Sequence, residues 1–283
     1  MSILVRIKTH GERGIFSKNG WLEESSIQLR SSNLLREIGE DALGRLEKIS
    51  CSDQKMDRAV VGIINDREAV NKTSYLLLGY AFELLLKGGI LSMYVHLPKQ
   101  LFDNDIRREY GHNLKKMAEE LEIGLSNDDV LLLENLEKDI IDFARYPISN
   151  CENKDFTNAI NNQRIRFSNN ELYGKYVQLY EHIKGKVLKV NSSSDDPAFS
   201  LTATMDEDGY FIYMSGGTLS NRMVYKFSTV QKQNGEDNKE KLYEFLINNL
   251  DSLVLKSFVE RDWLTAKHRV HKVRKNKHYL EPV

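Results

Sequence analysis

A helix that is apolar on nearly every side is the feature that most constrains how this chain can fold. Between Ser74 and Lys87 the only charged residues are Glu83 and Lys87. They are four positions apart, so a helix places them on one face, where they can pair. Because a buried charge must be paired, we expect a core helix whose two charges neutralise each other.

Two later segments carry signals for the ends of helices. A helix is predicted to start after His112, because Leu114, Met117 and Leu121 recur on one helical face. Another helix is predicted to end before Pro147, since proline disfavours the α conformation at the residue preceding it. The chain therefore offers a buried helix, a helix start and a helix end, in that order.

These three segments together resemble the HEPN family (higher eukaryotes and prokaryotes nucleotide-binding). The resemblance covers about residues 65–190 and rests on Phe82-Glu83-Leu84-Leu85-Leu86-Lys87, on Gly111-His112-Asn113-Leu114 and on Ala144-Arg145-Tyr146-Pro147. It implies a four- or five-helix bundle that binds RNA or nucleotides without a metal or other cofactor, in bacterial stress response or phage defence. It also implies a homodimer.

Many proteins of this family are metal-independent ribonucleases, marked by an arginine shortly before a histidine. Histidine titrates near neutral pH and can exchange the protons of RNA cleavage, while arginine stabilises negative charge at phosphorus. Two places come near this spacing: Arg107, with Arg108 directly after it, precedes His112, and Arg261 precedes His268. No histidine follows Arg145, the arginine nearest the family's catalytic place.

The alternative for His112 is structural, since a histidine at a helix start can cap that helix or bond Glu83. The chain would then bind RNA or nucleotides without cleaving them, and Lys87, Arg145 and His112 could line an anion site. A third possibility is a non-catalytic regulatory or scaffold subunit. Its N-terminal strand and C-terminal region would then hold a protein partner.

A basic C-terminal segment, residues 267–277, contains no acid and is the second candidate for binding nucleic acid. Its cations would contact phosphates without reading the base sequence. The alternatives are a solvated tail and a segment that pairs with acidic surface elsewhere. The candidate binding residues are Lys267, Arg269, Lys272 and Arg274.

Composition bounds the possible classes of protein. The net charge is −1 over 283 residues, so a basic surface must be local. Cys51 and Cys151 have no metal-ligand neighbours and are expected to be reduced thiols of a cytoplasmic protein. The N-terminus has no basic region followed by a long apolar run, so no signal peptide is expected. Glu83 interrupts the longest apolar run, so no membrane association is expected.

The predicted fold class is mainly α, with a HEPN-like bundle and a small α+β extension. The expected parts are an N-terminal strand and helix (1–57), the helical bundle (58–190) and a C-terminal region with a basic tail (198–283), after a linker at 191–197. In the last part we expect short strands at 199–204, 210–214 and 223–229, forming an antiparallel hairpin or meander, then a polar loop at 231–237 and one amphipathic helix at 241–264. In the bundle we expect helices at 22–49, 58–91, 113–121, 130–146 and 171–190, a loop at 97–105, and a helix or loop at 156–166.

Overall fold

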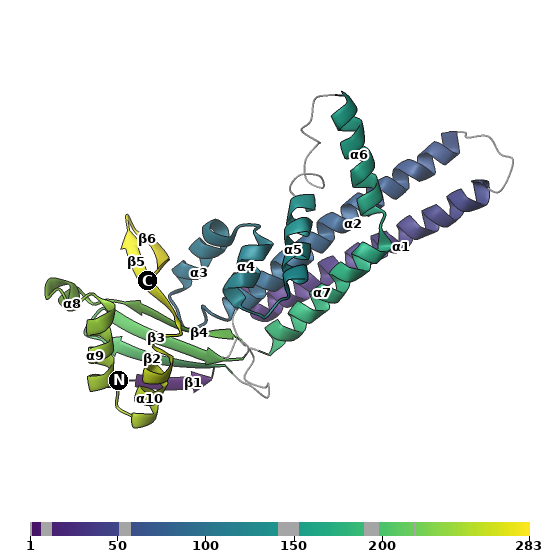
Figure 1. The fold of residues 1–283 in the computed structure, drawn as a ribbon. Helices are drawn as coiled ribbons and strands as arrows, with labels where there is room; N and C mark the ends of the chain where they lie inside the picture. The colour runs from purple at the N-terminus through teal and green to yellow at the C-terminus, as the bar shows by residue number, and fades with distance from the viewer. Residues whose placement is uncertain (1, 7–12, 51–57, 141–152, 190–197, 218) are drawn as a thin grey trace.

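The computed structural model describes residues 2–6, 13–50, 58–140, 153–189, 198–217 and 219–283, and it is mainly helical with one mixed β-sheet (Figure 1). Arg145, Cys51, Cys151 and the predicted linker at 191–197 lie outside the described residues. The helical part has helices α1 to α7 and the short helices η1 and η2. Their bounds are η1 (Gly14–Phe16), α1 (Lys18–Ser50), α2 (Arg58–Leu91), α3 (Lys99–Asp105), η2 (Ile106–Tyr110), α4 (Leu114–Leu121), α5 (Asn127–Asp139), α6 (Asn153–Phe167) and α7 (Asn170–Leu188).

Helix α2 is the centre of the helical part, as its composition predicts. Leu78, Phe82 and Leu85 have no exposed surface, and α1, α4, α5, α6 and α7 all contact this helix. By length and composition α2 could also cross a membrane, but 72% of its most apolar window is buried inside the protein. Most of this apolar surface is therefore packed against other parts of the protein.

Small hydroxyl side chains set the close packing of α1 against α2 and α7. The Oγ of Ser25 donates to the carbonyl of Ala81 at 2.6 Å, and the Oγ of Ser32 donates to the carbonyl of Ser74 at 2.7 Å. The hydroxyl groups of Tyr180 and Tyr173, both on α7, lie within hydrogen-bonding distance of the same two serines. Both serine hydroxyl groups have partners, so they can be buried where the three helices approach closely.

The C-terminal part is a six-stranded sheet in the order β1-β2-β3-β4-β5-β6, antiparallel except for the parallel pair β4 and β5. Helices α8 to α10 form the crossover between these two parallel strands. The bounds are β1 (Ser2–Arg6), β2 (Phe199–Met205), β3 (Gly209–Gly216), β4 (Leu219–Lys226), α8 (Thr229–Gln233), α9 (Lys239–Asn249), α10 (Leu253–Asp262), β5 (Lys267–Arg274) and β6 (Lys277–Pro282).

Alternate residues of β3 are buried on opposite faces of the sheet. Phe211 and Tyr213 belong to a core shared with α9 and α10, whereas Ile212 and Met214 belong to the core of the helical part. The sheet is thus covered on one face by α9 and α10 and on the other by the bundle. Because both faces are apolar, this strand is an almost continuous apolar run.

The N-terminal 57 residues supply one element to each part of the molecule. Strand β1 pairs with β2 at the edge of the sheet, and α1 packs along α2 in the bundle (Figure 1). The predicted edge strand at the N-terminus is confirmed. Its pairing with a segment about two hundred residues later has no signature in local sequence.

The predicted antiparallel meander is confirmed as β2, β3 and β4, and the sheet is mixed only because β5, which was not expected, returns parallel to β4. Three local predictions were wrong. The expected helix at 241–264 is two helices, α9 and α10, which bury Leu242 and Val259 in one core from different directions. Residues 97–105 and 231–237 were expected to be loops, but they contain α3 and most of α8 respectively.

The predicted basic tail was also wrong, since residues 267–277 form strand β5 and the turn into β6. In α5, Leu131 is 54% exposed, whereas Leu133 is buried. The leucine run at 131–133 allows either phase of the helix, and packing against α2 and α4 selected one.

The closest approach of α5 to α2 gives a stability prediction. A Cβ added at Gly79 would lie 1.8 Å from Cδ1 of Ile140, while a Cβ at Gly62, on the same helix, meets nothing within 4 Å. We expect Gly79→Ala to lower the free energy of unfolding by about 1–3 kcal/mol through overpacking. Gly62→Ala should raise it by about 0.5–1 kcal/mol through helix propensity. Urea unfolding measures both values, and equal effects of the two substitutions would contradict this packing.

Candidate functional site

Contact between α3 and β6 brings two basic segments, far apart in the sequence, to one side of the molecule. Asn104 Nδ2 donates to the carbonyl of His278 at 3.2 Å, and α3 continues directly into η2. Arg107 and Arg108 on η2 are therefore held beside the β5–β6 hairpin. The hairpin supplies four further cations, Lys272, Arg274, Lys275 and Lys277.

The hairpin turn concentrates cations at its tip. Arg274 pairs with Lys277, so Lys275 and Asn276 are the two loop residues, with φ values of 49° and 59°. Two positive φ values are the pattern of a type I′ turn, in which asparagine and glycine are preferred. A lysine in this left-handed conformation costs free energy, and such positions are often retained for function.

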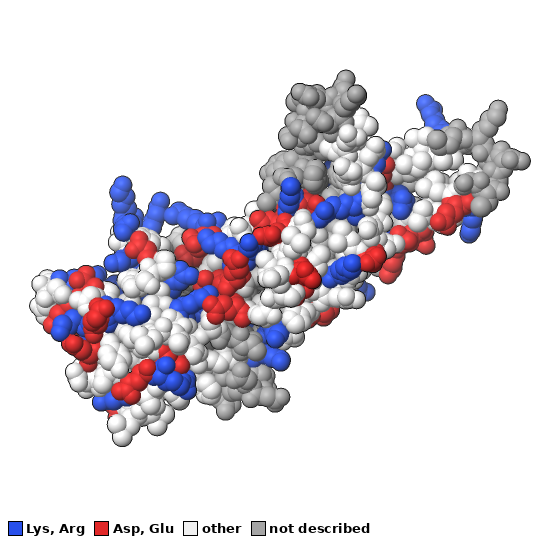
Figure 2. Space-filling model, in the orientation of Figure 1, with Lys and Arg blue, Asp and Glu red and all other residues white. Residues whose placement is uncertain are grey.

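We call Arg107, Arg108, Lys272, Arg274, Lys275 and Lys277 the basic surface. Five of the six are exposed and Lys272 is half-buried. Arg107 pairs with Asp103 at 3.0 Å and Arg274 with Glu281 at 3.2 Å, so these two acids leave an excess of four positive charges (six minus two). Figure 2 shows the blue side chains projecting from the region of the hairpin.

A second cluster joins Glu83, Lys87 and His112. Lys87 Nζ lies 2.6 Å from Glu83 Oε1, and His112 Nδ1 lies 2.7 Å from Glu83 Oε2. The predicted ion pair is therefore present, and both of its side chains are almost fully buried. Since a carboxylate only accepts, Nδ1 of His112 carries a proton, and in the neutral ring Nε2 keeps its lone pair.

The position of His112 follows from the start of α4. Asn113 caps this helix by accepting from the backbone N–H of Lys116 at 2.7 Å, and the positive φ of Gly111 turns the chain just before it. The His112 side chain is 50% exposed. Among the described residues, no hydrogen bond or ion pair joins it to Arg107 or Arg108. It is thus a solvent-facing histidine oriented by a carboxylate.

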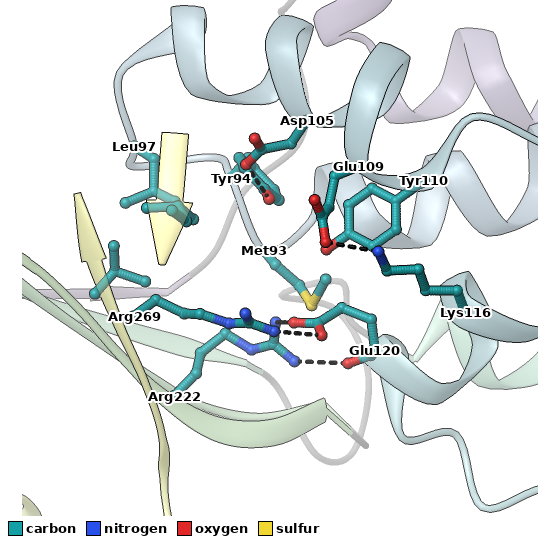
Figure 3. Close-up of a pocket in the computed structure, with 12 residues that line it drawn as sticks. Met93, Tyr94, Leu97, Asp105, Glu109, Tyr110, Lys116, Glu120, Arg222 and Arg269 are labelled. Atoms are coloured by element: carbon teal, nitrogen blue, oxygen red, sulfur yellow. Dashed lines mark hydrogen bonds and ion pairs between the residues drawn. The ribbon is translucent and has the colours of Figure 1, made fainter. Parts of the chain in front are cut away.

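A polar pocket of about 50 Å³ lies where the bundle meets the sheet (Figure 3). Arg222 from β4 and Arg269 from β5 form one wall, with Glu120 of α4 between them and the bundle. Asp105 and Glu109 lie across the pocket. The remaining lining side chains are Met93, Tyr94, Leu97, Tyr110, Lys116, Val224 and Leu280.

Glu120 is the acid on which the cations of the sheet converge. Arg222 Nη1 donates to Glu120 Oε1 at 3.2 Å, and Arg269 Nη2 donates to Glu120 Oε2 at 2.8 Å. Lys267 lies at 4.0 Å and also pairs with Glu122 at 2.6 Å. One predicted alternative for the basic segment was that it pairs with acidic surface elsewhere. Lys267 and Arg269 do so.

Two groups in the pocket have unusual environments. Arg222 is only 5% exposed, and its Nε has no hydrogen-bond partner among the described residues. Asp105 accepts from the hydroxyl group of Tyr94 at 2.8 Å, and burial raises the pKa of Asp105 to about 6. Sequence reasoning missed both residues, since no local pattern marks them. Arg222 lies in a strand that is otherwise apolar near its centre, which is a weak signal for a buried charge.

The predicted pair Arg261 and His268 is not brought together as a solvent-facing site. Nε2 of His268 donates to the carbonyl of Trp263 at 2.7 Å, the residue is 6% exposed, and burial lowers the pKa of His268. Arg261 pairs with Asp262 instead, at 2.8 Å. His268 is thus a neutral core residue, a position unsuited to exchanging protons with a substrate.

Another histidine of the basic segment is also buried. Burial lowers the pKa of His271 to about 4, so its ring is neutral at pH 7. It lies 2.7 Å from the hydroxyl oxygen of Tyr210 and 2.9 Å from Nδ1 of His278. The positive charge of this segment therefore comes from its lysines and arginines.

A scan against family models, a search of curated proteins and a search of solved structures each found no match to this chain. The resemblance to the HEPN family stays a prediction, and the argument for function rests on the geometry of the described residues.

The buried pair on α2 gives a second stability prediction. Glu83→Ala leaves the ammonium of Lys87 buried without its carboxylate, and we expect a loss of about 3–5 kcal/mol in the free energy of unfolding. The control is Glu244→Ala, which removes an exposed pair with Lys241 and should leave the free energy of unfolding nearly unchanged. Thermal and urea unfolding measure both, and a small loss for Glu83→Ala would show that Lys87 reaches water.

Proposed function

We propose that this protein binds RNA through the basic surface, by contacts with the phosphate backbone. The supporting observation is that α3, which leads directly into the helix η2 carrying Arg107 and Arg108, contacts β6 of the basic hairpin. The protein has a net charge of −1, so its overall charge does not attract a polyanion. A local excess of positive charge on one side does, and it favours binding of the polyanion at that side. The resemblance to the HEPN family points the same way, and cytoplasmic location belongs to the same proposal.

The affinity of such binding depends on salt concentration, and the strength of that dependence reports the number of phosphate contacts. Each lysine or arginine that neutralises a phosphate releases counterions, so the affinity falls steeply as salt rises. Lys275 and Lys277 extend furthest along the hairpin, and no acid in the hairpin turn itself lies between them. They should therefore contribute to affinity without contributing to the core.

Fluorescence polarisation with labelled single-stranded RNA, measured over a salt series, tests this proposal. The double substitution Lys275→Gln and Lys277→Gln should weaken binding several-fold and reduce the slope of log affinity against log salt by about 0.7 for each lost contact. Lys241→Gln is the control, since it removes one exposed positive charge on α9, far along the chain from the basic surface. An equal loss of RNA affinity in the control, or an RNA affinity that does not change with salt concentration, would contradict the proposal.

A second candidate function is metal-independent RNA cleavage with His112 as the acid or base. The observation that favours it is the bond from His112 to Glu83, because a histidine oriented by a third group is a common arrangement in acid–base catalysis. Nε2 is the nitrogen available for a substrate proton. The half-exposed ring would be reached from solvent.

Cleavage of cellular RNA by the purified protein in excess EDTA tests this candidate. We expect His112→Gln to reduce the rate by about a hundredfold or more, the usual contribution of a general acid or base. His182→Gln, at an exposed histidine of α7, should leave the rate unchanged. If the wild-type protein does not cleave RNA at high concentration, the nuclease candidate is rejected and the binding proposal stands alone.

A further inference from the structure

We propose that the pocket between the bundle and the sheet is a binding site for a small oxyanion of the phosphate or sulfate type. The anion would lie against the guanidinium groups of Arg222 and Arg269. If that oxyanion is the terminal phosphate of a bound nucleic acid, the pocket is part of the proposed RNA-binding site and this inference rests on the proposed function. If the oxyanion is free in solution, the inference does not depend on RNA binding.

The guanidinium groups have more donors than their partners accept. Arg222 uses Nη1 and Nη2 for Glu120 and for Ser220, whose Oγ lies at 3.1 Å, and this leaves Nε buried and unpaired among the described residues. Arg269 has one described bond, from Nη2 to Glu120. A buried donor without a partner is unfavourable, so a ligand that accepts from it is favoured.

The two arginines are also held in a fixed geometry. Figure 3 shows their side chains running side by side from neighbouring strands toward the same carboxylate. Strands β4 and β5 pair in register, Val224 opposite Arg269 and Arg222 opposite Lys267. A pair of guanidinium groups pre-organised in this way suits tetrahedral oxyanions, because each planar group can donate two parallel bonds.

The charge balance of the pocket allows an anion once Asp105 is neutral. The lining carries three acids, Asp105, Glu109 and Glu120, against three cations, Lys116, Arg222 and Arg269. Burial raises the pKa of Asp105 to about 6, so this carboxyl takes up a proton readily. With that proton bound, the lining has one excess positive charge.

Groups on every neighbouring element face Asp105, and they determine the sign of its effect. An anion close to the carboxylate raises its pKa further, so anion binding takes up a proton and is tighter below pH 6 than above it. The titratable and charged groups that line the pocket with Asp105 are Tyr94 after α2, Glu109 and Tyr110 on η2, Lys116 and Glu120 on α4, Arg222 on β4 and Arg269 on β5.

The ordinary alternative is that water fills the pocket. A buried water needs about 10–15 Å³ on the same measure of volume, so about 50 Å³ has room for a few waters or for one small oxyanion. Water would satisfy Nε of Arg222 as well. The two occupants differ in one respect, since only an oxyanion site gives a saturable heat of sulfate binding at constant ionic strength.

Isothermal titration calorimetry of the full-length protein with sodium sulfate, at ionic strength held constant with sodium chloride, is the primary test. Sulfate keeps the same charge across the range, so any pH dependence belongs to the protein. We expect one site per chain, with affinity about tenfold higher near pH 5.5 than near pH 7.5, as uptake of one proton by a group with a pKa of about 6 requires. Absence of saturable sulfate binding at both pH values would overturn the proposal and leave water as the occupant.

Two variants and one control locate the site. Arg269→Gln should weaken sulfate binding at least about tenfold, since it removes a charge-assisted donor. Leu280→Phe enlarges a side chain of the lining without changing any charge, and it should also weaken sulfate binding. This variant tests the site even if Arg269→Gln does not fold. The control is Arg164→Gln on α6, an exposed arginine paired with Glu68. Equal weakening by all three substitutions would overturn the site assignment.

A last comparison identifies the source of the oxyanion. Short RNAs of one sequence, with either a 5′-phosphate or a 5′-hydroxyl end, are compared for the wild type and for Arg269→Gln. A preference of the wild type for the phosphorylated end, lost in the variant, assigns the pocket to a terminal phosphate. Equal binding of both RNAs, with sulfate binding intact, assigns it to free phosphate. If neither RNA binds, the proposed function fails while the sulfate titration still decides the pocket.

Discussion

The burial of the second half of α2, from Ser74 to Leu91, is the constraint on which the rest of the structure depends. A helical segment without a polar face cannot lie at a surface, so other elements must cover its sides. Here α1, α4, α5, α6 and α7 contact α2. Each fully buried leucine or phenylalanine contributes about 1.5–3 kcal/mol relative to an exposed one, and this segment has several of them. The pair of Glu83 and Lys87 within it is tolerated because His112 and Lys87 satisfy both oxygens of Glu83.

The connection between bundle and sheet is of a different kind. Ile212, Met214 and Val224 extend the bundle core onto the sheet, but beside them Glu120 faces two guanidinium groups and an ammonium group. A buried ionic contact adds less stability than apolar packing of the same size, because its charges lose their hydration. Such a contact fixes the relative orientation of the groups that it joins, because the planar guanidinium group of arginine bonds a carboxylate in few orientations. The ligand chemistry that we infer for this junction comes from that geometry and from the donors that Glu120 leaves unused.

The histidines show how tertiary context separates residues of one type. His112 is half exposed and bonded to a carboxylate, whereas His268 and His271 are buried and neutral. In sequence, His112 and His268 follow arginines at similar spacing, and nothing local distinguishes them. The difference arises because β5 enters a sheet that is covered on both faces, which buries His268 on one face and His271 on the other.

The sequence by itself determined the core helix and three strands, which were expected at 199–204, 210–214 and 223–229 and lie at 199–205, 209–216 and 219–226. It also determined the pairing of Glu83 with Lys87, since helical spacing alone places them together. Only the tertiary structure decided the pairing of β1 with β2, the return of β5 alongside β4, and the contact of α3 with β6. It also decided the assembly of Arg222, Arg269, Asp105 and Glu120 around one pocket. These contacts depend on how two apolar cores close on opposite faces of one sheet, which no local period encodes.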